Sequence, residues 1–220
     1  MAHSTHRRTS VAHLRKEYSR AELNESDLES GPYEQFRSWF DQAVAADLPE
    51  PTAMTLASAT KKGKPSARIV LMKEFSDRGF LFFTNYESRK GRELLENPAA
   101  ALLFHWVELE RQVRIEGVVT KASRRQSEEY FQTRPTGSQL GAWASKQSEV
   151  VADRGVLERK LALLEEEFDG KKIAMPSYWG GFLLKPSAME FWQGRPNRLH
   201  DRLLYTRGRG NTWTIKRLSP

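Results

Sequence analysis

The sequence predicts a mainly β protein, an antiparallel β-barrel with helical decoration. Many short runs of β-branched and aromatic residues are separated by turn-forming residues, which is typical of such barrels. Two of these turns, Lys62-Gly63-Lys64-Pro65 and Asp77-Arg78-Gly79, follow each other closely and indicate successive hairpins. The chain shows no internal repeat and no Gly/Ser-rich linker. We therefore expect a disordered polar tail over residues 1–12 and a single domain over residues 13–220.

The elements of this fold can be placed along the chain from the spacing of apolar residues. Ser123 has capping-box spacing, and Asp153 has the position of an N-cap. Helices are expected over residues 33–46, 87–96, 123–134 and 153–168. Strands are expected over residues 52–59, 67–75, 80–84, 99–106, 111–121, 178–184, 188–193, 199–206 and 212–218.

The stretch from Glu190 to Leu204 is rich in groups that bind anions. A strand across Arg198, His200 and Arg202 would place all three side chains on one face. Such groups repel one another unless an anion lies against them. The pattern indicates either an anionic ligand or the solvated face of a surface hairpin, and it does not separate the two.

Composition narrows the class of protein. The formal net charge is +7, which suits either nucleic acid or small phosphate ligands. There is no cysteine, no visible signal peptide and no apolar run near the ~20 residues of a membrane span, so we expect a cytoplasmic protein. Dinucleotide-binding, P-loop and nucleophile-elbow motifs are absent, and the histidines lack metal-ligand spacing. Hydrolytic and metal-dependent mechanisms are therefore disfavoured, and no metal is expected.

Cationic and hydroxyl side chains gather in clusters at predicted strand ends and helix starts. A single arginine or lysine is usually a surface charge, but two clusters together suggest two phosphates. The groups are Arg68 with Lys73, Arg89-Lys90 after Ser88, Tyr130 and Arg134 with Ser138, and Gln147-Ser148. Arg68 and Lys73 are five residues apart, so both can reach one ligand only if the strand bulges or ends between them.

Several segments together resemble the pyridoxine/pyridoxamine 5′-phosphate oxidase family, in order, from about His13 to the C-terminus. They are Arg68-Ile69-Val70-Leu71-Met72-Lys73, Phe83-Thr84-Asn85 with Ser88-Arg89-Lys90, Glu110-Arg111-Gln112-Val113, Tyr130-Phe131 with Arg134-Pro135, Ser145-Lys146-Gln147-Ser148, Trp179-Gly180-Gly181, and Glu190-Phe191-Trp192-Gln193-Gly194 with Asn197-Arg198-Leu199-His200-Asp201-Arg202.

The resemblance implies an FMN-binding split β-barrel that works as a homodimer with flavin at the interface. It implies oxidation of pyridoxine and pyridoxamine 5′-phosphate to pyridoxal 5′-phosphate, with O₂ as electron acceptor and H₂O₂ as product. Neither nucleic acid nor a membrane is then expected as a partner.

The resemblance also assigns site residues. The implied FMN positions are Arg68, Ile69, Val70, Leu71, Met72, Lys73, Phe83, Thr84, Arg89, Lys90, Gln112, Gln147, Ser148, Trp192 and Arg202. The implied substrate-phosphate positions are Lys73, Tyr130, Arg134 and Ser138. The implied positions near the pyridine ring are Arg198, Leu199 and His200, with a lid of Arg15, Lys16, Glu17 and Tyr18; Arg198 is expected to orient the substrate and His200 to assist at the ring or the 4′ group.

Two departures from the family pattern stand out, and two alternatives remain. Phe83 replaces a frequent Tyr, which keeps an aromatic wall but loses a hydroxyl, and Glu50 replaces a common Asp in the lid region. The first alternative is another split-barrel FMN oxidoreductase, such as a phenazine-pathway oxidase or a flavin reductase. The second is a module that binds pyridoxal phosphate or nucleic acid without catalysis.

Overall fold

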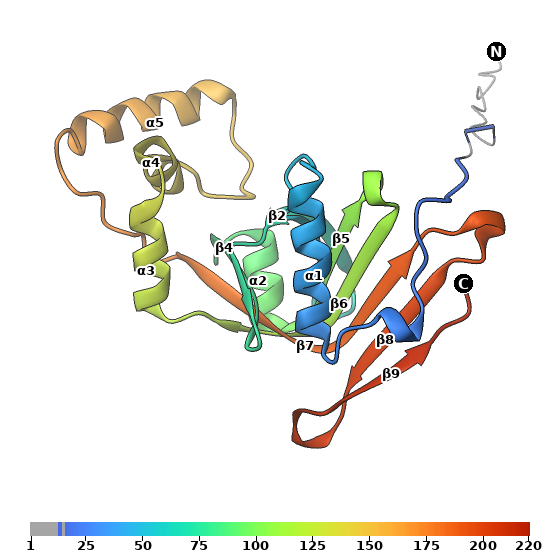
Figure 1. Ribbon diagram of the computed structural model, residues 1–220. Helices are drawn as coiled ribbons and strands as arrows, with labels where there is room; N and C mark the ends of the chain where they lie inside the picture. Colours follow the sequence, from blue (N-terminus) through green and yellow to red (C-terminus); the bar gives the residue numbers. More distant parts are fainter. Residues whose placement is uncertain (1–12, 15) are drawn as a thin grey trace, which may run out of the picture.

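The computed structural model describes residues 13–14 and 16–220, and its centre is one antiparallel sheet (Figure 1). The strand order is β2-β1-β5-β6-β7-β4-β3, with β8 paired to β7 and β9 paired to β8. The strands are β1 (Ala53–Ala59), β2 (Pro65–Leu71), β3 (Glu74–Ser76), β4 (Gly79–Asn85), β5 (Ala99–Trp106), β6 (Arg111–Lys121), β7 (Trp179–Gln193), β8 (Asp201–Arg207) and β9 (Trp213–Arg217). This confirms the predicted mainly β, antiparallel class. The expected tail over residues 1–12 and the expected lid residue Arg15 lie outside the described residues.

Helices lie against the sheet and beyond one end of it. They are α1 (Pro32–Ala45), α2 (Arg89–Glu96), α3 (Arg124–Thr133), α4 (Thr136–Ala144) and α5 (Arg154–Glu167). In Figure 1, α3, α4 and α5 form a group on one side, and the N-terminal segment runs beside β8 and β9 on the other side. Across the described ranges, the structure has no helix with the length and apolar character needed to cross a membrane.

Helix α1 supplies the centre of the main core. Phe36 is fully buried, and its ring lies 4.9 Å from the rings of both Phe75 and Phe80 and 5.0 Å from that of Phe104. The pattern of aromatic residues every three to four positions that predicted the helix is the face that contacts β3, β4 and β5. Strand β1 alternates buried and partly buried residues, as expected of a strand with one face on this core.

Two predicted strand boundaries are wrong, each for a local reason. The expected strand over residues 67–75 is divided into β2 and β3, because pairing with β1 ends at Leu71 and the backbone N–H of Lys73 donates to the Leu81 carbonyl of β4 instead. The expected strands over residues 178–184 and 188–193 are one strand, β7. Ser187 is the extra residue of a bulge opposite Glu116 and Gly117, and the bulge lets β7 continue past Pro186, which cannot donate to the ladder.

The prediction for residues 199–206 is also wrong at its start, and one helix was missed. Strand β8 begins at Asp201, because Asn197 and Arg198 have φ values of +55° and +64° and turn the chain out of extended geometry. Arg198 and His200 therefore do not share a strand face with Arg202. Helix α4 begins directly after Pro135, and its Gly- and Ser-containing sequence carries little helical periodicity.

Candidate functional site

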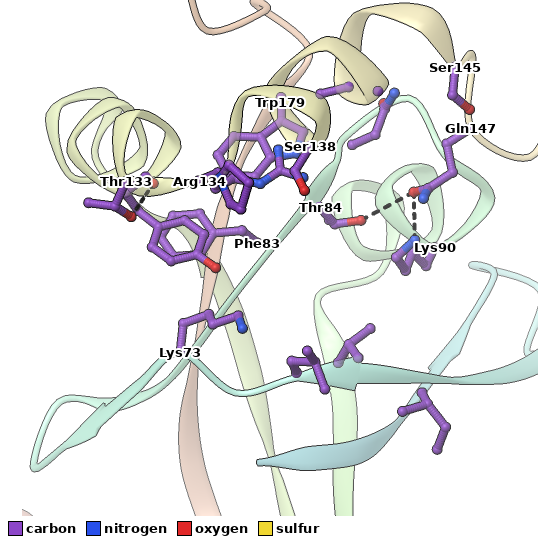
Figure 2. A pocket seen from close by; sticks show the side chains of 18 residues that line it. Lys73, Phe83, Thr84, Lys90, Thr133, Arg134, Ser138, Ser145, Gln147 and Trp179 are labelled. Carbon is purple, nitrogen blue, oxygen red and sulfur yellow. Dashed lines mark hydrogen bonds between the residues drawn. The ribbon is translucent and has the colours of Figure 1, made fainter. Parts of the chain in front are cut away.

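A cavity of about 840 Å³ lies between the end of β2, strand β4 and the helices α3 and α4; we call it the first cavity (Figure 2). The end of β2 at Leu71 lets the chain turn, so that Lys73 lines the same cavity as Ile69 to Leu71. The lining residues are Ile69, Val70, Leu71, Lys73, Phe83, Thr84, Asn85, Lys90, Tyr130, Thr133, Arg134, Pro135, Ser138, Gly141, Ala142, Ser145, Gln147 and Trp179. Three of the lining residues are cations, and none of the described lining residues is a carboxylate.

Arg134 is a partly buried cation that has no anionic partner among the described residues. The Nη1 atom of Arg134 is buried and has no hydrogen-bond partner among the described residues, while the guanidinium carbon lies 4.9 Å from the Trp179 ring centroid. Burial lowers the pKa of Arg134 below its usual value, since the charged form loses hydration there. An unsatisfied donor of this kind is costly, so the geometry favours an anion close to Arg134.

Lys90 and Gln147 form a second polar group, on the other side of the cavity in Figure 2 from Arg134 and Ser138. The Nζ atom of Lys90 donates to the Oε1 atom of Gln147 at 2.7 Å, and Thr84 donates to the same oxygen at 3.4 Å. Burial, and then the nearby charge of Arg68, lower the pKa of Lys90 to about 8. Lys90 follows the N-cap Ser88 of α2, where backbone N–H groups also favour an anion.

A stack of aromatic rings forms one wall of the cavity. The Phe83 ring lies 4.1 Å from that of Tyr130 and 5.3 Å from that of Trp179, and all three rings are nearly parallel. Phe83 therefore keeps the aromatic wall expected for this position. Trp179 was part of a recognised motif, but no role was assigned to it; its place directly before Gly180-Gly181 at the start of β7 is the signal that marks it.

The first cavity collects most of the predicted FMN and substrate-phosphate residues. Those that line it are Ile69, Val70, Leu71, Lys73, Phe83, Thr84, Lys90, Gln147, Tyr130, Arg134 and Ser138. Tyr130 lies within α3, whereas Arg134 is the residue that ends this helix. Asn85, Thr133 and Ser145 also line the cavity and are not among the implied site residues. Asn85 and Ser145 belong to segments that carry the family resemblance, and Thr133 lies directly before Arg134.

Other predicted FMN residues lie outside the lining of the first cavity. Met72 is buried in the main core. The side chain of Arg202 pairs with Glu190, with an Nε–Oε1 distance of 2.7 Å. Gln112 is opposite Trp192 in the β6–β7 register. The hydroxyl of Ser148 accepts a hydrogen bond from the backbone N–H of Arg89, and the side chains of Arg68 and Arg89 both pair with Glu93.

Most of the remaining predicted residues that the structure describes border a second cavity of about 480 Å³. It is lined by Leu14, Lys16, Glu17, Tyr18, Arg195, Asn197, Arg198 and His200, none of which lines the first cavity. Leu199 and Glu50 are both exposed, and neither residue lines either cavity. The structure therefore gathers many, though not all, of the predicted site residues around two separate cavities within one chain.

His200 is held in one tautomer. Its Nδ1 atom accepts a hydrogen bond from the backbone N–H of Arg195 at 3.0 Å, so the neutral ring carries its proton on Nε2. Burial, and then the charge of Arg198, lower the pKa of His200 below its usual value of 6.5. The ring of Trp192 lies 4.6 Å from that of His200. His200 is thus suited to donate a hydrogen bond from Nε2 at neutral pH.

Residues 16–28 are here called the N-terminal strap, and its first three residues, Lys16, Glu17 and Tyr18, line the second cavity. The ring of Tyr18 makes edge contacts with those of Trp192 and His200, each at 5.8 Å. The backbone N–H groups of Ser19 and Arg20 both donate to the Oε2 atom of Glu110, at 2.9 and 3.0 Å.

The strap has further anchors beyond Glu110. The N–H of Leu23 donates to Asp201, and Arg217 pairs with both Glu25 and Asp201. Gly194 is needed beneath Tyr18, because a Cβ at this position would lie 2.7 Å from the Tyr18 side chain.

Comparison with protein families gives two adjoining matches. Residues 40–166 match the family model described as pyridoxamine 5′-phosphate oxidase, and residues 179–220 match the C-terminal dimerisation region of pyridoxine 5′-phosphate oxidase. Among curated relatives, a pyridoxine/pyridoxamine 5′-phosphate oxidase of Trichormus variabilis is 55% identical over 96% of this chain and 98% of its own. One of Paraburkholderia phymatum is 57% identical over 96% of this chain and all of its own.

Two solved structures share the fold. PhzG from Burkholderia lata, in complex with tetrahydrophenazine-1-carboxylic acid, is 33% identical, with a TM-score of 0.86 over 92% of this chain and 99% of its own. A pyridoxamine 5′-phosphate oxidase-related, FMN-binding protein from Nostoc punctiforme is 17% identical, with a TM-score of 0.68 over 88% of this chain and all of its own. The second likeness shows that the sheet has the split-barrel fold predicted for it.

Proposed function

Because the chain belongs to the pyridoxamine 5′-phosphate oxidase family, we propose that it oxidises pyridoxine and pyridoxamine 5′-phosphate to pyridoxal 5′-phosphate, with O₂ as electron acceptor and H₂O₂ as product. One observation carries the proposal: the partly buried Arg134, whose Nη1 atom is buried and has no hydrogen-bond partner among the described residues, in a cavity whose described lining has cations but no carboxylate. This arrangement suits an anionic ligand with an aromatic body, and a phosphorylated pyridine is such a ligand.

The residues around the first cavity also fit FMN as a cofactor. The aromatic and aliphatic walls suit a flat ring system, and the group around Lys90, Gln147 and Thr84 suits a phosphate. We assign FMN to Arg68, Ile69, Val70, Leu71, Met72, Lys73, Phe83, Thr84, Arg89, Lys90, Gln112, Gln147, Ser148, Trp192 and Arg202. When bound, FMN supplies the redox chemistry, accepting a hydride equivalent from the substrate and passing electrons to O₂.

The chain's own residues bind and orient the substrate. Lys73, Arg134 and Ser138 would hold the substrate phosphate, with the hydroxyl of Tyr130 beside them. Clamping the phosphate at one end fixes the position of the substrate's C4′ atom, which is the main entropic contribution that binding can make. Arg134 can contact two phosphate oxygens at once through its planar guanidinium.

We propose that a second copy of the chain completes the site, with FMN at the subunit interface. Arg198 and His200 line a different cavity from Arg134, and residues 179–220 match a dimerisation region, which supports a homodimer. In this arrangement Arg198 of one copy orients the pyridine ring bound to the other, and His200 donates a hydrogen bond from Nε2 to the ring or the 4′ group. Leu199 and the segment Arg15 to Tyr18 would cover the ring and exclude water.

The test is reduction without oxygen. Pyridoxine 5′-phosphate is added anaerobically to the FMN-loaded protein, and the flavin absorbance is followed. Bleaching that returns on admitting air is expected. Stable yellow colour would contradict the assigned substrates, and failure to take up FMN would contradict a flavoenzyme and favour a binding module.

Arg134 gives a sharper form of the same test. Arg134→Ala is expected to raise KM for pyridoxine 5′-phosphate by roughly ten- to a hundredfold, since it removes a charge-assisted contact. The exposed Arg124→Ala, ten residues earlier at the start of α3, is the control and should leave KM unchanged.

A second candidate function follows from the likeness to PhzG, whose structure holds tetrahydrophenazine-1-carboxylic acid. That compound carries a carboxylate and no phosphate, so it would use Arg134 but leave Lys73 and Ser138 with less to bind. Turnover of tetrahydrophenazine-1-carboxylic acid faster than that of pyridoxine 5′-phosphate would favour this candidate.

The lack of cysteine supports a reducing compartment, and we propose the cytoplasm as the site of action.

A further inference from the structure

Glu93 is a buried carboxylate that lines neither cavity. It lies on α2 with 4% of its surface exposed, and a charge at this depth needs donors to offset its lost hydration. Its Oε2 atom accepts hydrogen bonds from the hydroxyls of Ser58, at 2.6 Å, and Ser66, and from Nη2 of Arg68 at 3.3 Å. Its Oε1 atom accepts from Nε of Arg89 at 2.9 Å. Although burial alone would raise the pKa of Glu93, these hydrogen bonds and the charge of Arg89 lower it to about 2, so the side chain is ionised.

This carboxylate connects two elements that border the first cavity. Arg68 lies on β2, directly before the residues of that strand that line the cavity, and Arg89 is the first residue of α2, directly before Lys90. Among the described residues, Glu93 is the only acid in an ion pair with either arginine. The charge of Arg68 acts on Lys90, and the charge of Arg89 acts on Arg68, so Arg68 is close enough to both of the other cations for repulsion.

Arg68 is held at several points. Its Nη1 atom donates to the Leu56 carbonyl at 3.1 Å and to the Ser58 hydroxyl at 2.6 Å, and its Nη2 atom donates to Ser66 as well as to Glu93. Ser58 and Ser66 are themselves opposite each other in the β1–β2 register. The long side chains of Arg68 and Arg89 are thus held in place by Glu93 before a ligand binds, which lowers the entropic cost of binding.

We propose that Glu93 is a positioning residue for the phosphate group of FMN: it fixes Arg68 and Arg89 in place and offsets their mutual repulsion without touching the ligand. This inference rests on the proposed function, because it takes FMN to be the ligand at this end of the cavity. It goes beyond that function in assigning a role to a carboxylate that stands next to a phosphate site.

The experiment compares FMN with riboflavin, which has the same ring system and no phosphate. Dissociation constants for both are measured by flavin fluorescence in the wild type, in Glu93→Gln and in Glu96→Gln, an exposed carboxylate on the same helix. Glu93→Gln is expected to weaken FMN binding about tenfold, the loss of one charged hydrogen-bonded contact, and to leave riboflavin binding nearly unchanged. Glu96→Gln should change neither.

Two results with Glu93→Gln itself would overturn the inference. Equal weakening of FMN and riboflavin would mean that Glu93 supports the fold in general. Tighter FMN binding in Glu93→Gln would mean that the carboxylate opposes the phosphate.

Should Glu93→Gln fail to fold, the variant Ser58→Ala removes one hydrogen-bond donor to Glu93 while its charge stays. A smaller weakening of binding, for FMN and not for riboflavin, is then expected, and its absence would overturn the inference. A wild-type protein that binds neither flavin would instead remove the proposed function itself.

Discussion

In the first cavity, Arg134 and Lys90 are expected to bind anions, because both are partly buried and have no negatively charged partner among the described residues. Arg134 and Lys90 both have lowered pKa values whose first cause is lost hydration, and neither has a carboxylate partner among the described residues. A bound phosphate would stabilise the charged form of each side chain and so offset the hydration that it loses on burial. Glu93 differs from both, because its partners hold it in the charged form.

The pKa of Lys90 predicts how FMN binding depends on pH. With a pKa of about 8, Lys90 is protonated at pH 7 and largely neutral at pH 9, while the phosphate stays ionised across this range. The dissociation constant for FMN is therefore expected to rise about three- to tenfold from pH 7 to pH 9, as a charged contact becomes a neutral one. Lys90→Arg, which stays charged, should remove most of this rise; an equal rise in the variant would contradict the assignment.

His200 is expected to titrate below its usual value of 6.5, a result that NMR of the imidazole would measure. Arg198→Ala should raise the midpoint only in part, because burial is the larger cause. The sign for stability follows from linkage: as the pH falls below about 6.5, unfolded His200 takes up a proton that folded His200 resists, so the free energy of unfolding falls. A midpoint at or above 6.5 would contradict this.

At the scale of elements, the N-terminal strap is held in place by residues that lie far from it in the chain. Glu110, in a left-handed conformation with φ of +55°, presents one carboxylate oxygen to two successive backbone N–H groups, directly after Tyr18. Glu110→Ala is expected to speed amide hydrogen exchange over residues 18–23 and to raise KM for pyridoxine 5′-phosphate, because Tyr18 loses its fixed position.

The control for the strap is Glu108→Ala, in the same 3₁₀ turn but exposed. It should leave both exchange and KM unchanged. Unaltered exchange over residues 18–23 in Glu110→Ala would show that the other anchors, Asp201 and Arg217, hold the strap without Glu110.

At the scale of the whole molecule, two half-sites in one chain predict complementation between chains. In Figure 1 the α3–α4 group and the strap lie on different sides of the sheet. If the first cavity of one copy works with the second cavity of the other, Arg134→Ala and Arg198→Ala should each show little activity alone when pyridoxine 5′-phosphate is kept well below the raised KM. Mixed after unfolding and refolding, they should regain roughly a quarter of wild-type sites, since half of random dimers are mixed and each has one intact site. No recovery would place both cavities' functions within one chain.

The sequence by itself determined the antiparallel class, the positions of most helices and the family. These depend on local rules: aromatic spacing in α1, the Ser88, Ser123 and Asp153 caps, and turn residues between strands. Strand β2 ends at Leu71, between Arg68 and Lys73, which is the condition that a shared ligand requires; Lys73 lines the first cavity and Arg68 does not. Local rules failed where a neighbouring strand intervenes, as at Pro186, where the bulge opposite β6 lets one strand continue.

Only the tertiary structure decided how the site residues divide between two cavities. The alternation of Arg198, His200 and Arg202 predicted one strand face, but a left-handed turn at Asn197 and Arg198 separates them, and Arg202 pairs with Glu190 instead. Glu93 pairs with Arg68, 25 residues away in the chain, and Glu110 accepts a hydrogen bond from Ser19, 91 residues away. Such long-range contacts leave no periodic trace in a sequence, because they depend on which surfaces the folded sheet brings together.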